Sequence, residues 1–150
     1  MVKIREAKQE DYNKGIKYLL QEISKFHSDL RPNFFIDEFI DSKSYFEECL
    51  NNKDYYMYIA EKSKKVVGYV EFFVRTYPQR IKKTVFVTCI VVADYLKNQG
   101  IGKKLFREVE KISKKLNLAI ELNVWAFNKN AIEFYEGLGF KIQRYTLERE

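Results

Sequence analysis

The residues with the clearest chemical pattern lie between positions 90 and 105, where an apolar stretch leads into two glycines one residue apart and then into an amphipathic helix. The first turn of a helix has free N–H groups and a partial positive charge, so it suits the phosphates of a ligand. Gly100 and Gly102 would let such a ligand approach the backbone closely. We therefore expect an anion-binding turn here, to which Lys97, Lys103 and Lys104 add positive charge.

Two other phosphate-binding patterns do not fit this stretch. The P-loop requires Ser or Thr directly after Gly-Lys, and here Lys104 follows Gly102-Lys103. The dinucleotide pattern requires a third glycine where Leu105 stands. Taken alone, the glycine pair is also compatible with a tight strand-to-helix turn.

A second pattern near the C-terminus favours the ligand-binding interpretation. Residues 124–140 contain Asn128, Ala131, the pair Phe134-Tyr135 and a Gly-Phe turn that ends at Phe140. In this order and spacing, the two stretches resemble the acetyl-CoA motif and the second signature of the GNAT N-acetyltransferase superfamily. The resemblance spans residues 85 to 142. Lys97 takes the place of the usual Arg or Gln, and residues 84–92 lack the carboxylate that many relatives carry there.

The resemblance implies transfer of an acetyl group from acetyl-CoA, a cosubstrate, to a primary amine by direct attack in a ternary complex. The pyrophosphate would lie on the amides of residues 98–103, and the pantetheine arm would follow the strand backbone at Ile90 and Val92. Asn128 would bond the arm from the other side. The implied cofactor-binding residues are Ile90, Val91, Val92, Lys97, Asn98, Gln99, Gly100, Ile101, Gly102, Lys103 and Asn128.

Proton transfer needs an acid for the leaving thiolate and a base for the attacking amine. Tyr135 occupies the family's usual position for the acid, and its alternative is a core aromatic beside Phe134. Glu71 and Glu121 are the candidate bases, although a solvent-facing position is favoured for each over a catalytic one. A water chain held by backbone groups would serve as well.

Residues on the acceptor side resemble a substrate-binding segment of some family members. This segment contains His27, Arg31 and Phe34. A histidine at a helix end is an equally good interpretation of His27. The sequence leaves the acceptor open between small amines and protein amines, and it leaves the acyl group and a homodimeric state open.

Composition sets the remaining limits. The chain has 150 residues, which suits a single domain over residues 1–150, and 46% hydrophobic residues are enough for a buried core. A net charge of +6 favours an anionic partner. A nucleic-acid-binding module is disfavoured, because the aromatics fall at core periodicities without an interleaved basic run, so we expect no nucleic acid as partner. A CoA-binding sensor without turnover is the other alternative.

Cofactor and compartment expectations follow from residue counts. One histidine and two separated cysteines, Cys49 and Cys89, do not make a zinc site, so we expect no metal. The charged residues that begin at Lys3 exclude a signal peptide, and no apolar run approaches membrane-spanning length. We therefore expect a cytoplasmic protein with reduced thiols and no membrane partner.

The elements that must position these residues follow from hydrophobic periodicity. We expect an α/β fold with a mixed, mostly antiparallel sheet of six to seven strands, flanked by helices and splayed between the strands at 84–92 and 118–125. Helices are predicted at residues 11–27, 37–50, 100–116 and 128–137. The other strands are predicted at residues 2–6, 55–61, 66–77 and 140–147, and the second and third of these form a hairpin.

Overall fold

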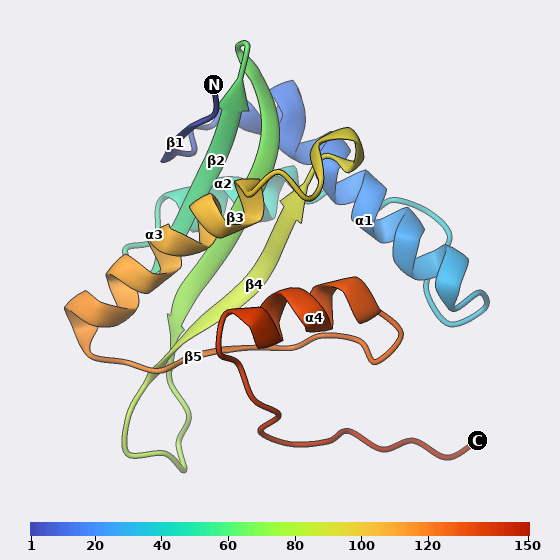
Figure 1. The fold of residues 1–150 in the computed structure, drawn as a ribbon, viewed down its shortest axis with the longest axis vertical. Helices are drawn as coiled ribbons and strands as arrows, with labels where there is room; N and C mark the ends of the chain where they lie inside the picture. Colours follow the sequence, from blue (N-terminus) through green and yellow to red (C-terminus); the bar gives the residue numbers. More distant parts are fainter.

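The computed structural model describes residues 1–150 and contains one five-stranded sheet in the order β1-β2-β3-β4-β5 (Figure 1). The first four strands pair antiparallel, and β5 pairs parallel to β4. The strands are β1 (Lys3–Glu6), β2 (Tyr55–Lys62), β3 (Lys65–Arg75), β4 (Thr84–Val92) and β5 (Ile120–Leu122). The mixed α/β architecture is as the sequence predicts.

Four α-helices and two shorter helical turns cover the sheet. The π-helix η1 (Tyr12–Ile16) continues into α1 (Lys17–Leu30), and a 3-10 turn, η2 (Asp94–Leu96), precedes α3. The remaining helices are α2 (Lys43–Leu50), α3 (Ile101–Leu116) and α4 (Lys129–Gly137). None of these helices has the length and apolar content that crossing a membrane requires.

The helices lie on both faces of the sheet, and two neighbouring residues of β3 show this division. The ring of Tyr69 packs against Phe46 of α2, with centroids 6.2 Å apart. Gly68 faces the opposite side, where a Cβ would lie 3.0 Å from Leu105 of α3. Since successive strand residues point to opposite faces, α2 covers one face and α3 the other. In Figure 1, α3 and α4 lie in front of the sheet and α2 lies behind it.

The predicted hairpin of β2 and β3 is confirmed. Its two-residue connection, Ser63 and Lys64, has φ angles of 51° and 63°. Positive φ at both positions is the geometry of a type I′ turn, whose twist matches that of the flanking strands. The turn therefore fixes the register of the two strands that carry much of the core.

The adjacency of β4 and β5 is also confirmed, and their pairing is short. Residues Val85 to Val87 pair with Ile120 to Leu122, and β4 then continues without a partner on this side as far as Val92. The two strands thus part at their C-terminal ends, as the sequence predicts. Figure 1 shows α4 lying in front of the region where they separate.

The prediction of six to seven strands is wrong, because the strand expected at residues 140–147 does not form. Residues 141–150 make no backbone hydrogen bonds, and all of them are exposed. The neighbouring strand β5 has only three residues instead of the predicted eight, so it offers little edge for pairing. β5 ends at Leu122, and Trp125 beyond it stacks on Phe127 with ring centroids 5.9 Å apart.

The predicted helix at residues 37–50 is too long at its start. Helix α2 begins only at Lys43, and residues 31–42 form turns and irregular structure. Asp41 explains the boundary, since its side chain accepts hydrogen bonds from the Tyr12 hydroxyl and the Lys43 amide, both at 2.9 Å. A carboxylate that bonds nearby backbone amides favours a helix start over a helix interior.

Candidate functional site

An irregularity in β4 determines which backbone groups face the opening beside β5. Glu71 pairs with Cys89 and Phe72 pairs with Val87, so Thr88 is an extra residue that forms a β-bulge. Before the bulge, the Val85 amide donates towards β5, to the Ala119 carbonyl at 2.9 Å.

After the bulge, the direction of the backbone groups is reversed. The Ala93 amide donates to the Val67 carbonyl on the β3 side, also at 2.9 Å. Backbone direction alternates along a strand, so an even spacing from Val85 to Ala93 would give both amides the same direction. The bulge at Thr88 shifts this alternation by one residue, which turns the N–H and C=O groups of Ile90 and Val92 towards the unpaired side.

The predicted anion-binding turn joins η2 to α3, and its geometry suits phosphates. Gly100 is the residue before the helix and has φ 81°, and Asn98 has φ 64°. The amides of residues 98–103 donate to no backbone carbonyl, and no side chain caps the helix. The first turn of α3 contains no acidic residue. Six consecutive free N–H groups at a helix start are donors that suit a pyrophosphate.

Lysines surround this turn. Lys97, Lys103 and Lys104 are exposed, and the ammonium of Lys97 lies 2.7 Å from the Asp94 carboxylate. Both partners of this pair are more than half exposed, so the pair is weak and Lys97 can turn towards an anion at little cost.

Helix α4 packs directly against the start of α3. A Cβ at Gly102 would lie 3.2 Å from Cζ of Phe134, so the glycine permits the close approach of these helices. At the start of α4, the Asn128 side chain accepts a hydrogen bond from the Ala131 amide at 3.3 Å. Its oxygen therefore caps the helix, and its NH2 group stays available as a donor.

Tyr135 projects from α4 into a largely apolar environment. Its ring contacts Phe134 and Phe140, with centroid distances of 5.4 and 5.6 Å. Burial raises the pKa of Tyr135 above its ordinary value, and nearby Cys89 of β4 adds to the shift. The phenol is therefore protonated at neutral pH and lies near the region where β4 and β5 separate.

Glu71 is buried, so the expectation that it faces solvent is wrong. Its side chain is 6% exposed and accepts hydrogen bonds from the hydroxyls of Tyr69 at 2.8 Å and Tyr45 at 3.1 Å. Burial raises the pKa of Glu71, and the hydrogen bonds from Tyr69, Tyr45 and Thr88 limit the rise. A buried carboxyl with a raised pKa, directly opposite Cys89, suits proton transfer better than an exposed one. The sequence showed no sign of the two tyrosines, because their contact with Glu71 depends on tertiary packing.

Glu121 does not face solvent freely either, and its environment differs from that of Glu71. It accepts hydrogen bonds from Arg80 and Thr84 at 2.9 Å and from Gln143 at 3.3 Å. Burial opposes ionisation, but hydrogen bonds from Tyr77, Arg80, Thr84 and Gln143 outweigh it and lower the pKa of Glu121 to about 2. So weak a base, with its oxygens already occupied, is poorly suited to deprotonate an amine.

The acceptor-side residues belong to a cluster of aromatic rings. His27 of α1 stacks on Phe35 at 5.3 Å and lies edge-on to Phe127 at 5.9 Å. Burial lowers the pKa of His27, so the imidazole is neutral at pH 7. The structure therefore brings the end of α1 next to the segment that precedes Asn128. We call the six side chains Phe26, His27, Phe34, Phe35, Trp125 and Phe127 the aromatic cluster.

The sequence predicts two members of this cluster, His27 and Phe34, as site residues. The other four members, Phe26, Phe35, Trp125 and Phe127, were missed as site residues, although Phe34-Phe35 and the Trp-Ala-Phe sequence are unusually aromatic for connecting segments. That density of rings outside regular elements was the available signal. Arg31 lies at the edge of the cluster, with its guanidinium carbon 3.7 Å from the Phe34 ring centroid.

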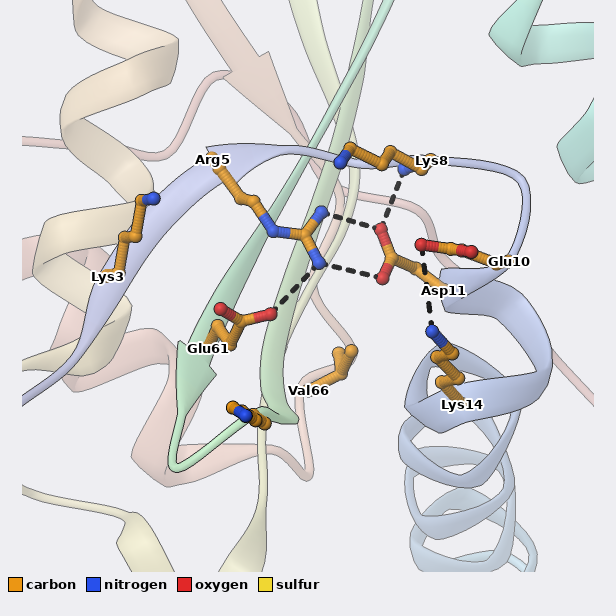
Figure 2. Close-up of a pocket in the computed structure, with 9 residues that line it drawn as sticks. Lys3, Arg5, Lys8, Glu10, Asp11, Lys14, Glu61 and Val66 are labelled. Carbon is orange, nitrogen blue, oxygen red and sulfur yellow. Dashed lines mark hydrogen bonds and ion pairs between the residues drawn. The ribbon is translucent and has the colours of Figure 1, made fainter.

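The pocket drawn in Figure 2 lies at the other edge of the sheet, beside β1. There Arg5 donates to both carboxylate oxygens of Asp11, at 2.8 and 2.9 Å, and to Glu61 at 3.0 Å. The Lys8 amide adds a bond to Asp11 at 2.7 Å. These charges satisfy one another, so the pocket ties β1 and β2 to the start of η1. No group of three or more His, Cys, Asp or Glu side chains is arranged to hold a metal ion.

A sheet whose strands β4 and β5 separate, a helix start with free amides and helix α4 in front of the gap together form the arrangement that the sequence resemblance implies. The model of the acetyltransferase (GNAT) family matches residues 20–140, and the chain belongs to that family. Among curated proteins, no sequence match is significant.

Solved structures agree with this fold. A tetramutant of the BH1408 protein from Bacillus halodurans is 25% identical, with 99% of each chain covered and a TM-score of 0.89. Glucosamine-6-phosphate N-acetyltransferase from Arabidopsis thaliana is 19% identical, with 100% of this chain and 98% of that chain covered and a TM-score of 0.75. An aminoglycoside acetyltransferase from an uncultured soil metagenomic sample, in complex with trehalose, is 19% identical, with 99% and 94% covered and a TM-score of 0.71.

Proposed function

We propose that the protein is an acetyl-CoA-dependent N-acetyltransferase that acts on a primary amine by direct attack in a ternary complex. The observation that carries the proposal is the row of six free amides at residues 98–103, next to a strand whose backbone groups at Ile90 and Val92 have no partner. The amides and Lys97 and Lys103 hold the phosphates of the cosubstrate. The backbone of Ile90 to Val92 and the Asn128 amide hold its extended arm.

The chain's own groups then handle the charges of the reaction. A backbone N–H at the bulged end of β4 stabilises the negative charge that develops on the thioester oxygen. As the nitrogen–carbon bond forms and the carbon–sulfur bond breaks, the Tyr135 hydroxyl gives a proton to the departing sulfur. The raised pKa leaves the Tyr135 phenol protonated at neutral pH, and it also makes the phenol a weaker acid than an exposed tyrosine, so the charge that develops on the sulfur must drive the transfer.

Glu71 is the base in this proposal, and it acts through water. Free amines have a pKa near 10, so the acceptor loses a proton before or during attack. The pKa of Glu71 is raised, so it lies closer to neutral pH than the pKa of an exposed glutamate does. Tyr45 bonds to Glu71 and is 44% exposed, which gives the proton a route towards solvent. The low pKa of Glu121 argues against this role for it.

The acceptor lies in this proposal between the unpaired end of β4 and the aromatic cluster. His27, Arg31 and Phe34 line its far side. Phe127 directly precedes Asn128, so the cluster is adjacent in sequence to the predicted cofactor contact.

Two measurements test the function. Isothermal titration calorimetry should show saturable binding of acetyl-CoA. A thiol reagent should detect release of CoA with at least one member of an amine panel. The panel contains amino acids, amino sugar phosphates, aminoglycosides, polyamines and lysine peptides. Binding without release from any acceptor would favour the CoA-sensor alternative, and an absence of binding would remove both.

A further inference from the structure

The side chain of Arg31 is held in place by an aromatic ring. Arg31 follows directly after α1, and its guanidinium carbon lies 3.7 Å from the centroid of Phe34 and 5.9 Å from that of Trp125. Cation–π attraction orients a guanidinium over a ring face. The N–H donors then point past the edge of the ring and stay free to bind a ligand. Arg31 is therefore a preformed fork for a planar anion.

The fork is occupied by a carboxylate of the chain itself. Arg31 forms an ion pair with Glu148, which belongs to residues 141–150. This segment has no backbone hydrogen bonds, and the Glu148 side chain is 60% exposed. An ion pair that rests on an exposed, irregular segment is easily exchanged for another carboxylate.

Apolar surface lies immediately beside the fork. Phe34 is 49% exposed and Trp125 is 41% exposed, and their rings meet edge to face with centroids 5.6 Å apart. Exposed aromatic rings next to a cation complement a molecule that carries a carboxylate beside an apolar body. The net charge of +6 also favours an anionic over a cationic ligand.

Building on the proposed acetyl transfer, we propose that Arg31 binds a carboxylate of the amine acceptor and that Phe34 and Trp125 bind an adjoining apolar body. Glu148 competes with the acceptor for Arg31. The acceptor class is thus an amino acid or a related amine with a carboxylate and an apolar side chain. Its nitrogen forms the new bond to the acetyl carbon, the carbon–sulfur bond breaks, and the carboxylate passes through the reaction unchanged.

A binding experiment tests the fork without relying on turnover. Trp125 is the single tryptophan of the chain, so its fluorescence reports binding at this surface. N-acetylphenylalanine should bind about tenfold or more tightly than N-acetylphenylalaninamide, in which a neutral carboxamide of similar shape replaces the carboxylate. Arg31→Met should abolish this preference, and Arg31→Lys should retain part of it. Equal binding of acid and amide, or a preference that survives in Arg31→Met, overturns the proposal.

The competing role of Glu148 has its own comparison. Glu148→Gln should tighten binding of the acid by about two- to fivefold, since it removes a weak competitor, and should not change binding of the amide. Glu150→Gln is the matched control from the same segment and should leave both unchanged. Unaltered acid binding in Glu148→Gln contradicts the competition.

Turnover separates this inference from the proposed function. The ratio of kcat/KM for phenylalanine to that for phenylalaninamide should fall at least tenfold in Arg31→Met, with thermal unfolding unchanged. Preference for an aminoglycoside or for glucosamine 6-phosphate over carboxylate acceptors would overturn the acceptor class while the function stands. If no acceptor releases CoA, the function fails, and the fluorescence preference still decides the carboxylate site.

Discussion

The guanidinium of Arg80 donates to both carboxylate oxygens of Glu121, each at 2.9 Å. Glu121 lies in β5, Arg80 lies in the connection between β3 and β4, and Thr84 at the start of β4 donates to the same carboxylate. The contact therefore joins three segments at the end of the sheet where β4 and β5 are still paired. The gap between β4 and β5 is closed at this end. We propose that the cosubstrate enters at the opposite end, where the strands have separated.

The hydrogen bonds that Glu121 accepts from Arg80 and Thr84 predict how the stability of the fold depends on pH. The pKa of Glu121 is lowered to about 2 in the folded protein, against an ordinary value of 4.5. The contribution of the Glu121 carboxylate to the free energy of unfolding is therefore complete above about pH 4.5 and is lost as the pH falls towards 2. Because solvent screens the pair, we expect a contribution on the order of 1 kcal/mol. Chemical denaturation of Glu121→Gln should show this loss at pH 7 and no difference from wild type near pH 2. A constant difference across the range would assign the effect to packing.

A second prediction concerns the approach of α3 to α4. In Gly102→Val, the new side chain would press on Phe134, which a Cβ alone would reach at 3.2 Å, and would cover the amides at the helix start. The dissociation constant for acetyl-CoA should rise at least tenfold, about 1.4 kcal/mol, in calorimetry. Gly137→Ala is the matched control, because a Cβ there meets nothing within 4 Å. Unchanged affinity in a folded Gly102→Val protein would disprove the phosphate site.

The hydrogen bonds to Glu71 predict a shift in the pH profile. The Tyr69 hydroxyl donates to Glu71 at 2.8 Å and lowers its pKa against the larger effect of burial. Removing this donor in Tyr69→Phe raises the pKa of Glu71 further, so the acidic limb of kcat/KM should move to higher pH. Glu71→Gln should lower kcat roughly 100-fold or more and flatten that limb. Tyr56→Phe, on the neighbouring strand, serves as control. An acidic limb that stays in place in Tyr69→Phe would exclude Glu71 as the base.

Local patterns in the sequence were sufficient for most of the elements and for the phosphate turn. The alternation of residues 55–75 and the β-branched run at 84–92 predict three strands because burial of one or both faces leaves a direct mark on residue type. Gly100 and Gly102 identify the turn because only a backbone without side chains suits that contact.

The remaining features depend on contacts between distant segments. The bulge at Thr88 is set by the register of β3 against β4, and no residue type in the strand marks it. The burial of Glu71 follows from Tyr45 of α2, and the low pKa of Glu121 follows from Arg80, 41 residues away. The false strand at 140–147 shows the same limit, because alternation predicts a strand only where a neighbouring edge exists to pair with it.

The last prediction concerns the Tyr135 hydroxyl. Burial raises its pKa, and Cys89 of β4, whose own thiol has its pKa raised to about 12 by burial, lies near enough to add to that shift. A neutral phenol at this position can give its proton to a departing thiolate but cannot act as a base at neutral pH. Tyr135→Phe should lower kcat and kcat/KM alike by roughly 10- to 1000-fold, the range of a general acid. Acetyl-CoA affinity should change little, since the ring contacts to Phe134 and Phe140 are kept. Single-turnover kinetics establish whether chemistry limits the rate, and wild-type turnover under that condition would reduce Tyr135 to a packing residue.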